Sequence, residues 1–323
     1  GQCIQSVIDD LLLAESKRSF CLPHLIMYRI VRIAIAALAS VGMLASVAAC
    51  GSGRSSSEKN GTIEVVASVN QWGTVAKTLG GGNVNVTSII NSTNVDAHDY
   101  EPTTSDIAKL QKAQVIIVNG AGYDAWAVKA AQSANATIVN AAAVGGVNDG
   151  ENPHVWFSAD VRKAVAQAIT EAYEQADAAK KSDFDKLHDQ WKSEENNVES
   201  KIAEVKQKSD GLAYAATESV ASYLAEDMGL TDATPSGYAR ATANESEPTP
   251  TDIRQFADAL KSGEIKLLIV NTQEESELTG KITNAAKSAN VPMVNLTEQM
   301  PEQYDSLTAW MESLVDAFSK AIA

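Results

Sequence analysis

The feature that most constrains the fold is an alternation of apolar, β-branched runs with helical patterns in two stretches of the chain. Apolar runs of strand length, separated by segments with helical spacing, predict a mostly parallel sheet with crossover helices in each stretch. The predicted strands are Ile63–Val69, Val84–Ile90, Val115–Asn119, Thr137–Asn140, Leu212–Thr217, Lys266–Asn271 and Val291–Leu296. The predicted helices are Trp72–Leu79, Ser105–Lys112, Trp126–Ala134, Ser219–Met228, Thr251–Lys261 and Glu277–Ala289.

The segment between these two stretches has a different character. From Ala159 to about Lys208 it contains neither Pro nor Gly, and Val198, Ile202 and Val205 recur at spacings of four and three. This periodicity predicts one or two long helices, the last of which connects the two halves. Residues 231–250 contain three prolines and are predicted to form a loop.

Length and composition agree with two lobes. The chain has 323 residues, which suits two domains better than one hydrophobic core. We predict two α/β lobes, each a small, mostly parallel sheet flanked by helices, over residues 62–180 and 209–323, with a linking helix over 181–208. The formal net charge of −15 argues against a nucleic-acid partner, which requires basic patches.

The first sixty residues resemble a bacterial lipoprotein leader. Residues 27–49 combine two arginines, an apolar run and small residues, which is the pattern of a signal peptide. Val47–Cys50 is similar to a lipobox, so Cys50 is the expected lipidation site and residues 50–61 the tether that follows it. The alternatives are a plain transmembrane anchor and a signal peptide cut near Ala49. Residues 1–26 are interpreted as an over-extended reading frame before Met27.

Beyond this leader the chain holds three histidines, His98, His154 and His188. His98 begins the sequence His-Asp-Tyr-Glu-Pro, and His154 lies in Asn-Pro-His-Val-Trp. His188 lies in the polar helical segment, and we predict that it faces solvent. No thiolate remains apart from Cys50, which weakens the case for a structural zinc site.

These motifs, followed by Thr-Glu-x-x-x-x-Tyr-Leu-Ala from Thr217, resemble those of the zinc- and manganese-binding lipoproteins of ABC importers. This is the cluster A-I, ZnuA-like or Lral family of substrate-binding proteins, and the resemblance covers about residues 62–323. It implies a monomer that holds a metal ion between two lobes at the extracellular face of the cell membrane or in the periplasm. The implied partners are an ABC permease and its ATPase.

The resemblance also implies four metal ligands, two from each lobe: His98, His154, Glu218 and Glu298. Glu298 is the least regular of these, since the family usually has Asp there. Each residue also has a purely structural interpretation. His98 could cap a loop, His154 could be a buried core residue, Glu218 could favour a helix N-terminus, and Glu298 could be a surface carboxylate. Trp72, Trp126 and Trp156 are interpreted as packing residues.

The ligand chemistry favours one divalent transition metal as cargo. Two neutral imidazoles and two carboxylates balance a +2 ion, and carboxylate oxygens favour harder ions such as Mn²⁺. The segment Ala121–Asn152 lacks the histidine-rich loop of many zinc-type members. We therefore predict Mn²⁺ ahead of Zn²⁺, with Fe²⁺ as a further candidate.

Two other functions remain open from the residues alone. A metal-dependent hydrolase also uses His and Glu ligands, but the chain has no His-Glu-x-x-His and no Gly-x-Ser-x-Gly. A surface adhesin is implied only by roles described for some family members. The chain also lacks a phosphate-binding Gly-x-x-x-x-Gly-Lys loop, so it is not the ATPase itself. We therefore predict a binding protein and not an enzyme.

Overall fold

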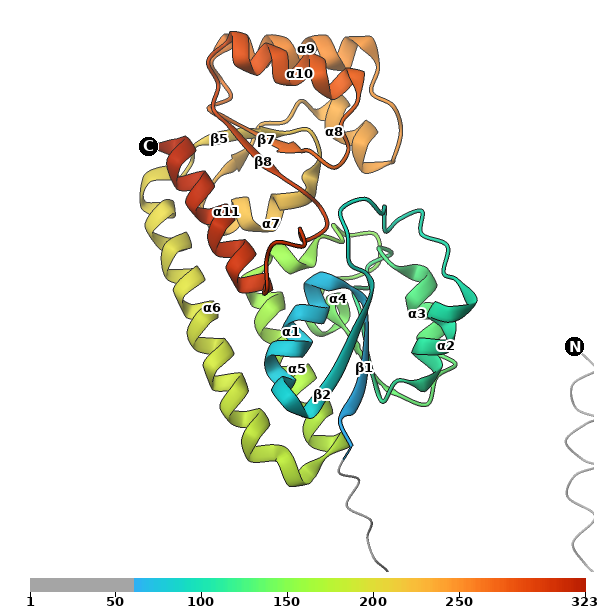
Figure 1. The fold of residues 1–323 in the computed structure, drawn as a ribbon. Coiled ribbons are helices and arrows are strands. Elements are labelled where there is room, and N and C mark those ends of the chain that lie inside the picture. Colours follow the sequence, from blue (N-terminus) through green and yellow to red (C-terminus); the bar gives the residue numbers. More distant parts are fainter. Residues whose placement is uncertain (1–60) are drawn as a thin grey trace, which may run out of the picture. The chain divides into compact units, whose positions relative to one another are not determined.

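A computed structural model describes residues 61–323 of the chain. Two parallel four-stranded sheets form its framework (Figure 1). The first contains β1 (Ile63–Val69), β2 (Val84–Ile90), β3 (Val115–Val118) and β4 (Thr137–Asn140), and the second β5 (Ala213–Ala216), β6 (Thr231–Asp232), β7 (Leu267–Asn271) and β8 (Met293–Leu296). Their strand orders are β2-β1-β3-β4 and β6-β5-β7-β8, so both sheets have the same topology.

Helices cover both faces of each sheet, because successive side chains along the strands point to opposite faces and are buried on both. Val65 and Ala67 of β1 face a core shared with α1 (Asn70–Gly80), α5 (Ala159–Ala176) and α6 (Lys181–Ser209). Val66 faces the opposite side, toward α2 (Thr104–Lys112) and α3 (Ala125–Ala131). In the second sheet, Leu268 and Val270 pack with α9 (Pro250–Ser262) and α10 (Glu277–Ser288). The predicted fold class is confirmed.

Helix α6 connects the two sheets. It has 29 residues, and its buried positions lie at helical spacing along one face. Helix α11 (Leu307–Ile322) lies beside α6 and α1, although it follows the last strand of the second sheet (Figure 1). No helix is predicted from the sequence at this position. A single core cluster includes side chains from both sheets and from these helices, so the two lobes share part of their interior.

Two sequence predictions are wrong. Part of the predicted loop over 231–250 forms β6 and α8 (Ser236–Ala243), which begins directly after Pro235, where a fixed φ suits a helix entrance. His188 is only 8% exposed instead of facing solvent. It lies on the buried face of α6 with Phe184 and Trp191, and its polar neighbours in sequence obscured that face.

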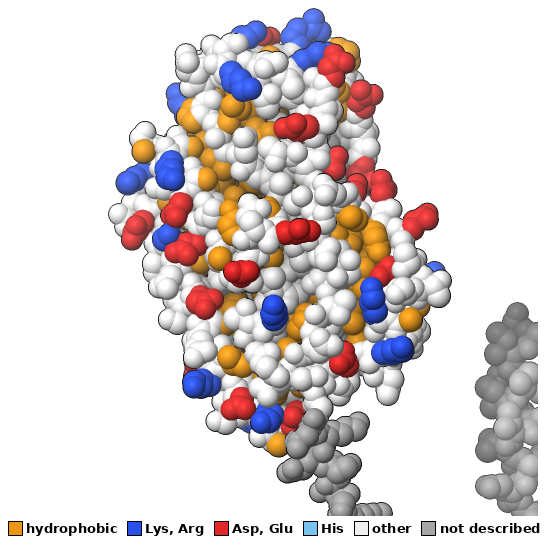
Figure 2. Space-filling view, viewed as in Figure 1, with side chains coloured by type: hydrophobic (Ala, Val, Ile, Leu, Met, Phe, Trp, Pro, Cys, Tyr) orange, Lys and Arg blue, Asp and Glu red, His pale blue; other side chains and the backbone are white. Residues whose placement is uncertain are grey.

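The remaining elements are short. They comprise α4 (Ala141–Val144), α7 (Ser222–Asp227) and the 3₁₀ turns η1 (Gly81–Asn83), η2 (Val155–Phe157), η3 (Ala178–Lys180) and η4 (Ser219–Ala221). Trp72 and Trp156 are fully buried, in agreement with their predicted packing role. On the face shown in Figure 2, acidic and basic side chains are interspersed over both lobes.

The predicted leader, Cys50 and all but the last residue of the predicted tether lie outside the described residues. Among the helices within 61–323, none combines the length and the apolar character required to cross a membrane.

Candidate metal centre

His98 lies in the loop between β2 and α2, and local hydrogen bonds hold this loop at several points. The backbone N–H of His98 donates to Asp96 Oδ1 at 2.8 Å. Thr103 and Asp106 form a reciprocal capping box at the start of α2, and the Tyr100 hydroxyl donates to the same Asp106 carboxylate at 2.7 Å. The loop is therefore fixed directly before and after His98.

His154 precedes the 3₁₀ turn η2 and is almost fully buried. Its backbone N–H and its ring Nδ1 both contact Asn152 Oδ1, at 3.0 and 2.7 Å. An amide oxygen can only accept, so Nδ1 carries the proton and donates it. Nε2 is thus directed away from Asn152 and toward Glu298, where it can donate a hydrogen bond when it carries a proton and offer its lone pair to a metal ion when it does not.

Glu298 lies in the loop after β8, and its side chain is 5% exposed. Two amide side chains from the start of α1 hold this loop. Gln71 Nε2 donates to the carbonyl of Glu298 at 3.3 Å, and Asn70 Nδ2 donates to the carbonyl of Met300 at 2.8 Å. The loop that follows the second sheet is therefore bound to the first lobe.

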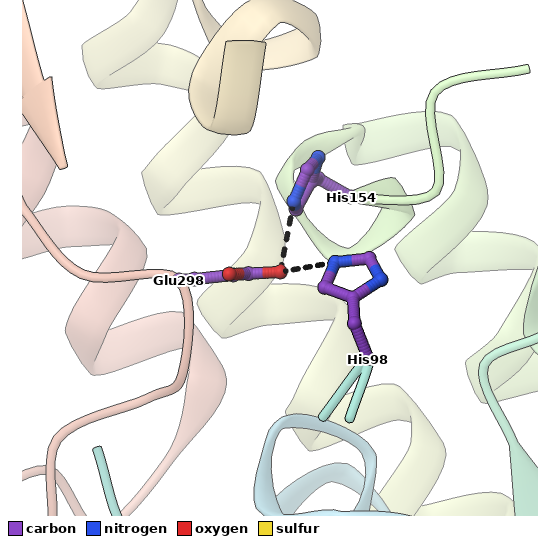
Figure 3. A group of neighbouring side chains, drawn as sticks. All are labelled: His98, His154 and Glu298. Carbon is purple, nitrogen blue, oxygen red and sulfur yellow. Dashed lines mark hydrogen bonds and ion pairs between the residues drawn. The ribbon is translucent and has the colours of Figure 1, made fainter. Parts of the chain in front are cut away.

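The two imidazoles converge on one carboxylate oxygen (Figure 3). Nε2 of His98 lies 3.1 Å from Glu298 Oε1, and Nε2 of His154 lies 3.0 Å from the same atom. One ligand atom from each of the three residues lies within 4.8 Å of the others. In octahedral coordination, adjacent ligand atoms about 2.1 Å from the metal ion and about 90° apart are separated from each other by about 3 Å. The cluster therefore has dimensions that suit a metal ion.

The electrostatics of this cluster favour a positive charge at its centre. The hydrogen bond with Glu298 raises the pKa of His98 to about 9, although burial opposes the change. Burial alone would raise the pKa of Glu298, but the hydrogen bonds from His154 and His98 outweigh it and lower that pKa to about 2. The carboxylate is therefore ionised at neutral pH, and a proton or a cation must balance it.

Glu218 stands apart from these three side chains. It follows β5, and its Oε2 accepts a 2.6 Å hydrogen bond from Asn271 Nδ2. It lines a cavity of about 540 Å³ together with His98 and Glu298, and a second cavity of about 440 Å³ together with His154. Burial, and then the negative charge of Glu298, raises the pKa of Glu218. The structure thus brings three of the four predicted ligands together and places the fourth on the wall of the same cleft.

Several residues that support the site are not predicted from the sequence. Tyr123 is fully buried, its ring centroid lies 4.8 Å from that of His98, and its hydroxyl accepts from Gln299 Nε2. Gly120 and Gly122 in the loop before it have φ of 79° and 84°, which glycine adopts without strain. Asn152 could have been identified, since an Asx residue two positions before a histidine commonly bonds to its backbone. Asn271 and Gln273 carry no comparable local signal.

Comparisons with known proteins agree with this fold. Residues 65–321 match the family described as "ZnuA: Zinc-uptake complex component A periplasmic". Among curated relatives, the manganese ABC transporter substrate-binding lipoprotein scaA of Streptococcus gordonii is 24% identical over 313 residues, which is 88% of this chain and 96% of the relative.

Two solved structures share the fold at lower identity. The periplasmic zinc-binding protein TroA of Treponema pallidum superposes with a TM-score of 0.68 at 14% identity, over 81% of this chain and 100% of TroA. The Mn-bound periplasmic metal-binding protein of Candidatus Liberibacter asiaticus superposes with a TM-score of 0.64 at 16% identity, over 80% of this chain and 99% of that chain.

Proposed function

Since the chain belongs to the ZnuA family of metal-uptake components, we propose that it captures one divalent transition-metal ion between its lobes and delivers it to an ABC permease. It is a binding protein of a transport system and not an enzyme, as its family membership indicates. The hydrolase alternative is therefore set aside.

The observation that carries this proposal is the convergence of two imidazole nitrogens on one carboxylate oxygen. Neutral imidazoles that direct their Nε2 lone pairs toward an ionised carboxylate would repel it. The 3.0 and 3.1 Å separations are favourable only when a proton or a metal ion lies between the groups. A divalent ion satisfies all three lone pairs at once, so His98, His154 and Glu298 are the proposed first three ligands.

We assign Glu218 as the fourth ligand and Mn²⁺ as the preferred cargo, with Zn²⁺ or Fe²⁺ as alternatives. Glu218 shares the cleft with the cluster, and a second carboxylate makes the ligand set richer in oxygen. Oxygen ligands favour Mn²⁺ relative to thiolate or all-imidazole sites. The relative from Streptococcus gordonii is named for manganese, whereas TroA is named for zinc.

We further propose that lipidated Cys50 attaches the chain to the extracellular face of the cell membrane, as a monomer that serves its permease and ATPase. The support is the leader pattern in the sequence and the lipoprotein name of the relative. The change Cys50→Ala should move the protein from the membrane fraction to the soluble fraction. Unchanged fractionation would contradict the anchor.

Calorimetric titration of the purified protein with Mn²⁺ and Zn²⁺ tests the metal site. We expect one ion per chain. His98→Ala and His154→Ala should each weaken Mn²⁺ binding by more than about 100-fold, since even partners of ligands cost 10–100-fold. His188→Ala is the matched control, because it removes a buried histidine that lines a different cavity, between α5 and α6. A double variant lacking His98 and His154 that binds Mn²⁺ like the wild type would refute the assignment.

A further inference from the structure

The segment from the end of β7 to Gln273 carries none of the four proposed ligands, yet it contacts three segments that do. Asn271, at the end of β7, is 2% exposed, and its Nδ2 donates to Glu218 Oε2 at 2.6 Å. Gln273, two residues later, accepts from the backbone N–H of Gln299, the neighbour of Glu298, at 3.0 Å. Its Nε2 donates to the carbonyl of Val95, in the loop that carries His98, at 3.4 Å.

The orientation of the Asn271 amide follows from its partners. The backbone N–H of Gln273 contacts Asn271 Oδ1 at 3.0 Å, and a backbone N–H can only donate. The oxygen of the amide must therefore face Gln273, and the NH₂ group must face Glu218. The backbone N–H of Asn271 is itself bound by the Thr217 hydroxyl at 3.0 Å, so the residue is fixed on both sides.

This arrangement controls the direction of the Glu218 carboxylate. One of its two oxygens is occupied by the amide of Asn271, which leaves the other available to the cleft that His98 and Glu298 also line. Without the amide the carboxylate could rotate about its side-chain torsions, and holding it still would cost conformational entropy when an ion binds.

We propose that Asn271 is the positioning residue that makes Glu218 an effective metal ligand and thereby sets the preference for Mn²⁺ over Zn²⁺. The inference rests on the proposed metal-binding function. Zn²⁺ is satisfied by few ligands and binds well to two imidazoles and one carboxylate. Mn²⁺ requires more oxygen ligands, so the loss of an oriented Glu218 weakens Mn²⁺ binding more than Zn²⁺ binding.

The decisive variant is Asn271→Asp, which keeps the size of the side chain. It replaces the NH₂ donor with a second acceptor and places a negative charge beside Glu218. We expect Mn²⁺ affinity to fall about 10–100-fold and Zn²⁺ affinity to fall about tenfold less, with one ion per chain retained. Asn271→Ser, which keeps a shorter donor, should change both affinities in the same direction by a smaller factor.

Asn295→Asp is the matched control. Asn295 lies on the adjacent strand β8, opposite Val270, and is exposed, so its exchange should leave both affinities within about twofold of the wild type. In a Glu218→Ala background, Asn271→Ser should have no further effect on the Mn²⁺ to Zn²⁺ ratio, because the residue acts through Glu218.

The outcomes distinguish a failure of the proposed metal-binding function from a failure of the proposed role of Asn271. A wild-type protein that binds neither ion refutes the proposed function itself. A wild-type protein that binds Mn²⁺, with Asn271 variants that keep its Mn²⁺ to Zn²⁺ ratio, refutes the role of Asn271 alone. If Asn271→Asp does not fold, Asn271→Ser and its combination with Glu218→Ala decide the question by the same ratio.

Discussion

The histidines and the carboxylates of the metal centre are held in different ways. His98 and His154 are each bonded by a residue two positions earlier in the sequence, Asp96 and Asn152. Glu218 is bonded by Asn271, 53 residues away, and the backbone of Glu298 is bonded by Gln71, 227 residues away. The backbones of both histidines and the ring of His154 are therefore held within their own segments, whereas the carboxylates depend on tertiary contacts.

The histidine side of the site (His98 and His154) and the carboxylate side (Glu218 and Glu298) also differ in the interactions that support them. The turn after His154 rests on a buried ion pair, since Arg162 Nη1 donates to the carbonyl of Trp156 and its guanidinium contacts Glu195. The carboxylate side is held by neutral amides such as Asn70, Gln71 and Gln273. Substitutions that remove the support of the histidine side should thus mainly lower the stability of the fold. Substitutions that remove the support of the carboxylate side should mainly change the metal preference.

The largest effect is expected at the ion pair. Arg162→Met leaves Glu195, 1% exposed, as an uncompensated buried charge, so the free energy of unfolding should fall by about 3–5 kcal/mol. Combining Arg162→Met with Glu195→Leu should recover most of that loss, since both charges are then absent. Urea unfolding measures both variants.

Lys163→Met, at the next position, is the control. The lysine is 43% exposed, so each of its two ion pairs, with Asp160 and Glu199, should contribute less than about 1 kcal/mol. A double variant as unstable as Arg162→Met would mean that the hydrogen bond to Trp156, and not charge compensation, stabilises this turn.

A smaller effect is expected at Asn152, which serves both sides of the site. Its Oδ1 orients His154, and its Nδ2 donates to the carbonyl of Ser219, next to Glu218, at 2.8 Å. Asn152→Ala removes both contacts and should weaken Mn²⁺ binding by about tenfold or more. Asn152→Asp keeps the acceptor for His154 and should lose less.

Asn148→Ala, in the exposed turn before Asn152, provides the comparison in the same calorimetric titration. If Asn152→Asp binds Mn²⁺ as weakly as Asn152→Ala, the contact with Ser219 matters more than the orientation of His154.

The smallest effect is expected from a change of a single pH unit. The pKa of His98 is raised to about 9, so the metal-free protein holds a proton on this side chain at neutral pH. An ion must displace that proton, so Mn²⁺ affinity should fall by at most about tenfold for each pH unit below about 9. Titration in buffers of different ionisation enthalpy should detect about one proton released per ion at about pH 7. An affinity that is constant between about pH 6 and pH 8 would contradict this coupling.

Local patterns in the sequence determined most of the secondary structure. The strands Ile63–Val69, Val84–Ile90 and Thr137–Asn140 have the predicted bounds, because alternating or continuous apolar runs specify burial without knowledge of the neighbours. The sequence was less informative where burial depends on other elements. His188 lies where α5 packs against α6, and the sequence around His188 gives no sign of that contact.

The same distinction between local sequence patterns and tertiary contacts holds for the metal centre. His98 and His154 could be identified from the sequence because each lies in a short motif with its own supporting residues. The separation of Glu218 from the three clustered ligands, and the amide of Asn271 that holds it, were decided only by the tertiary structure. Strands β5 and β7 are adjacent in the second sheet, and this pairing brings residues 53 positions apart to a distance of 2.6 Å. Sheet pairing is a non-local choice, so local sequence patterns cannot specify it.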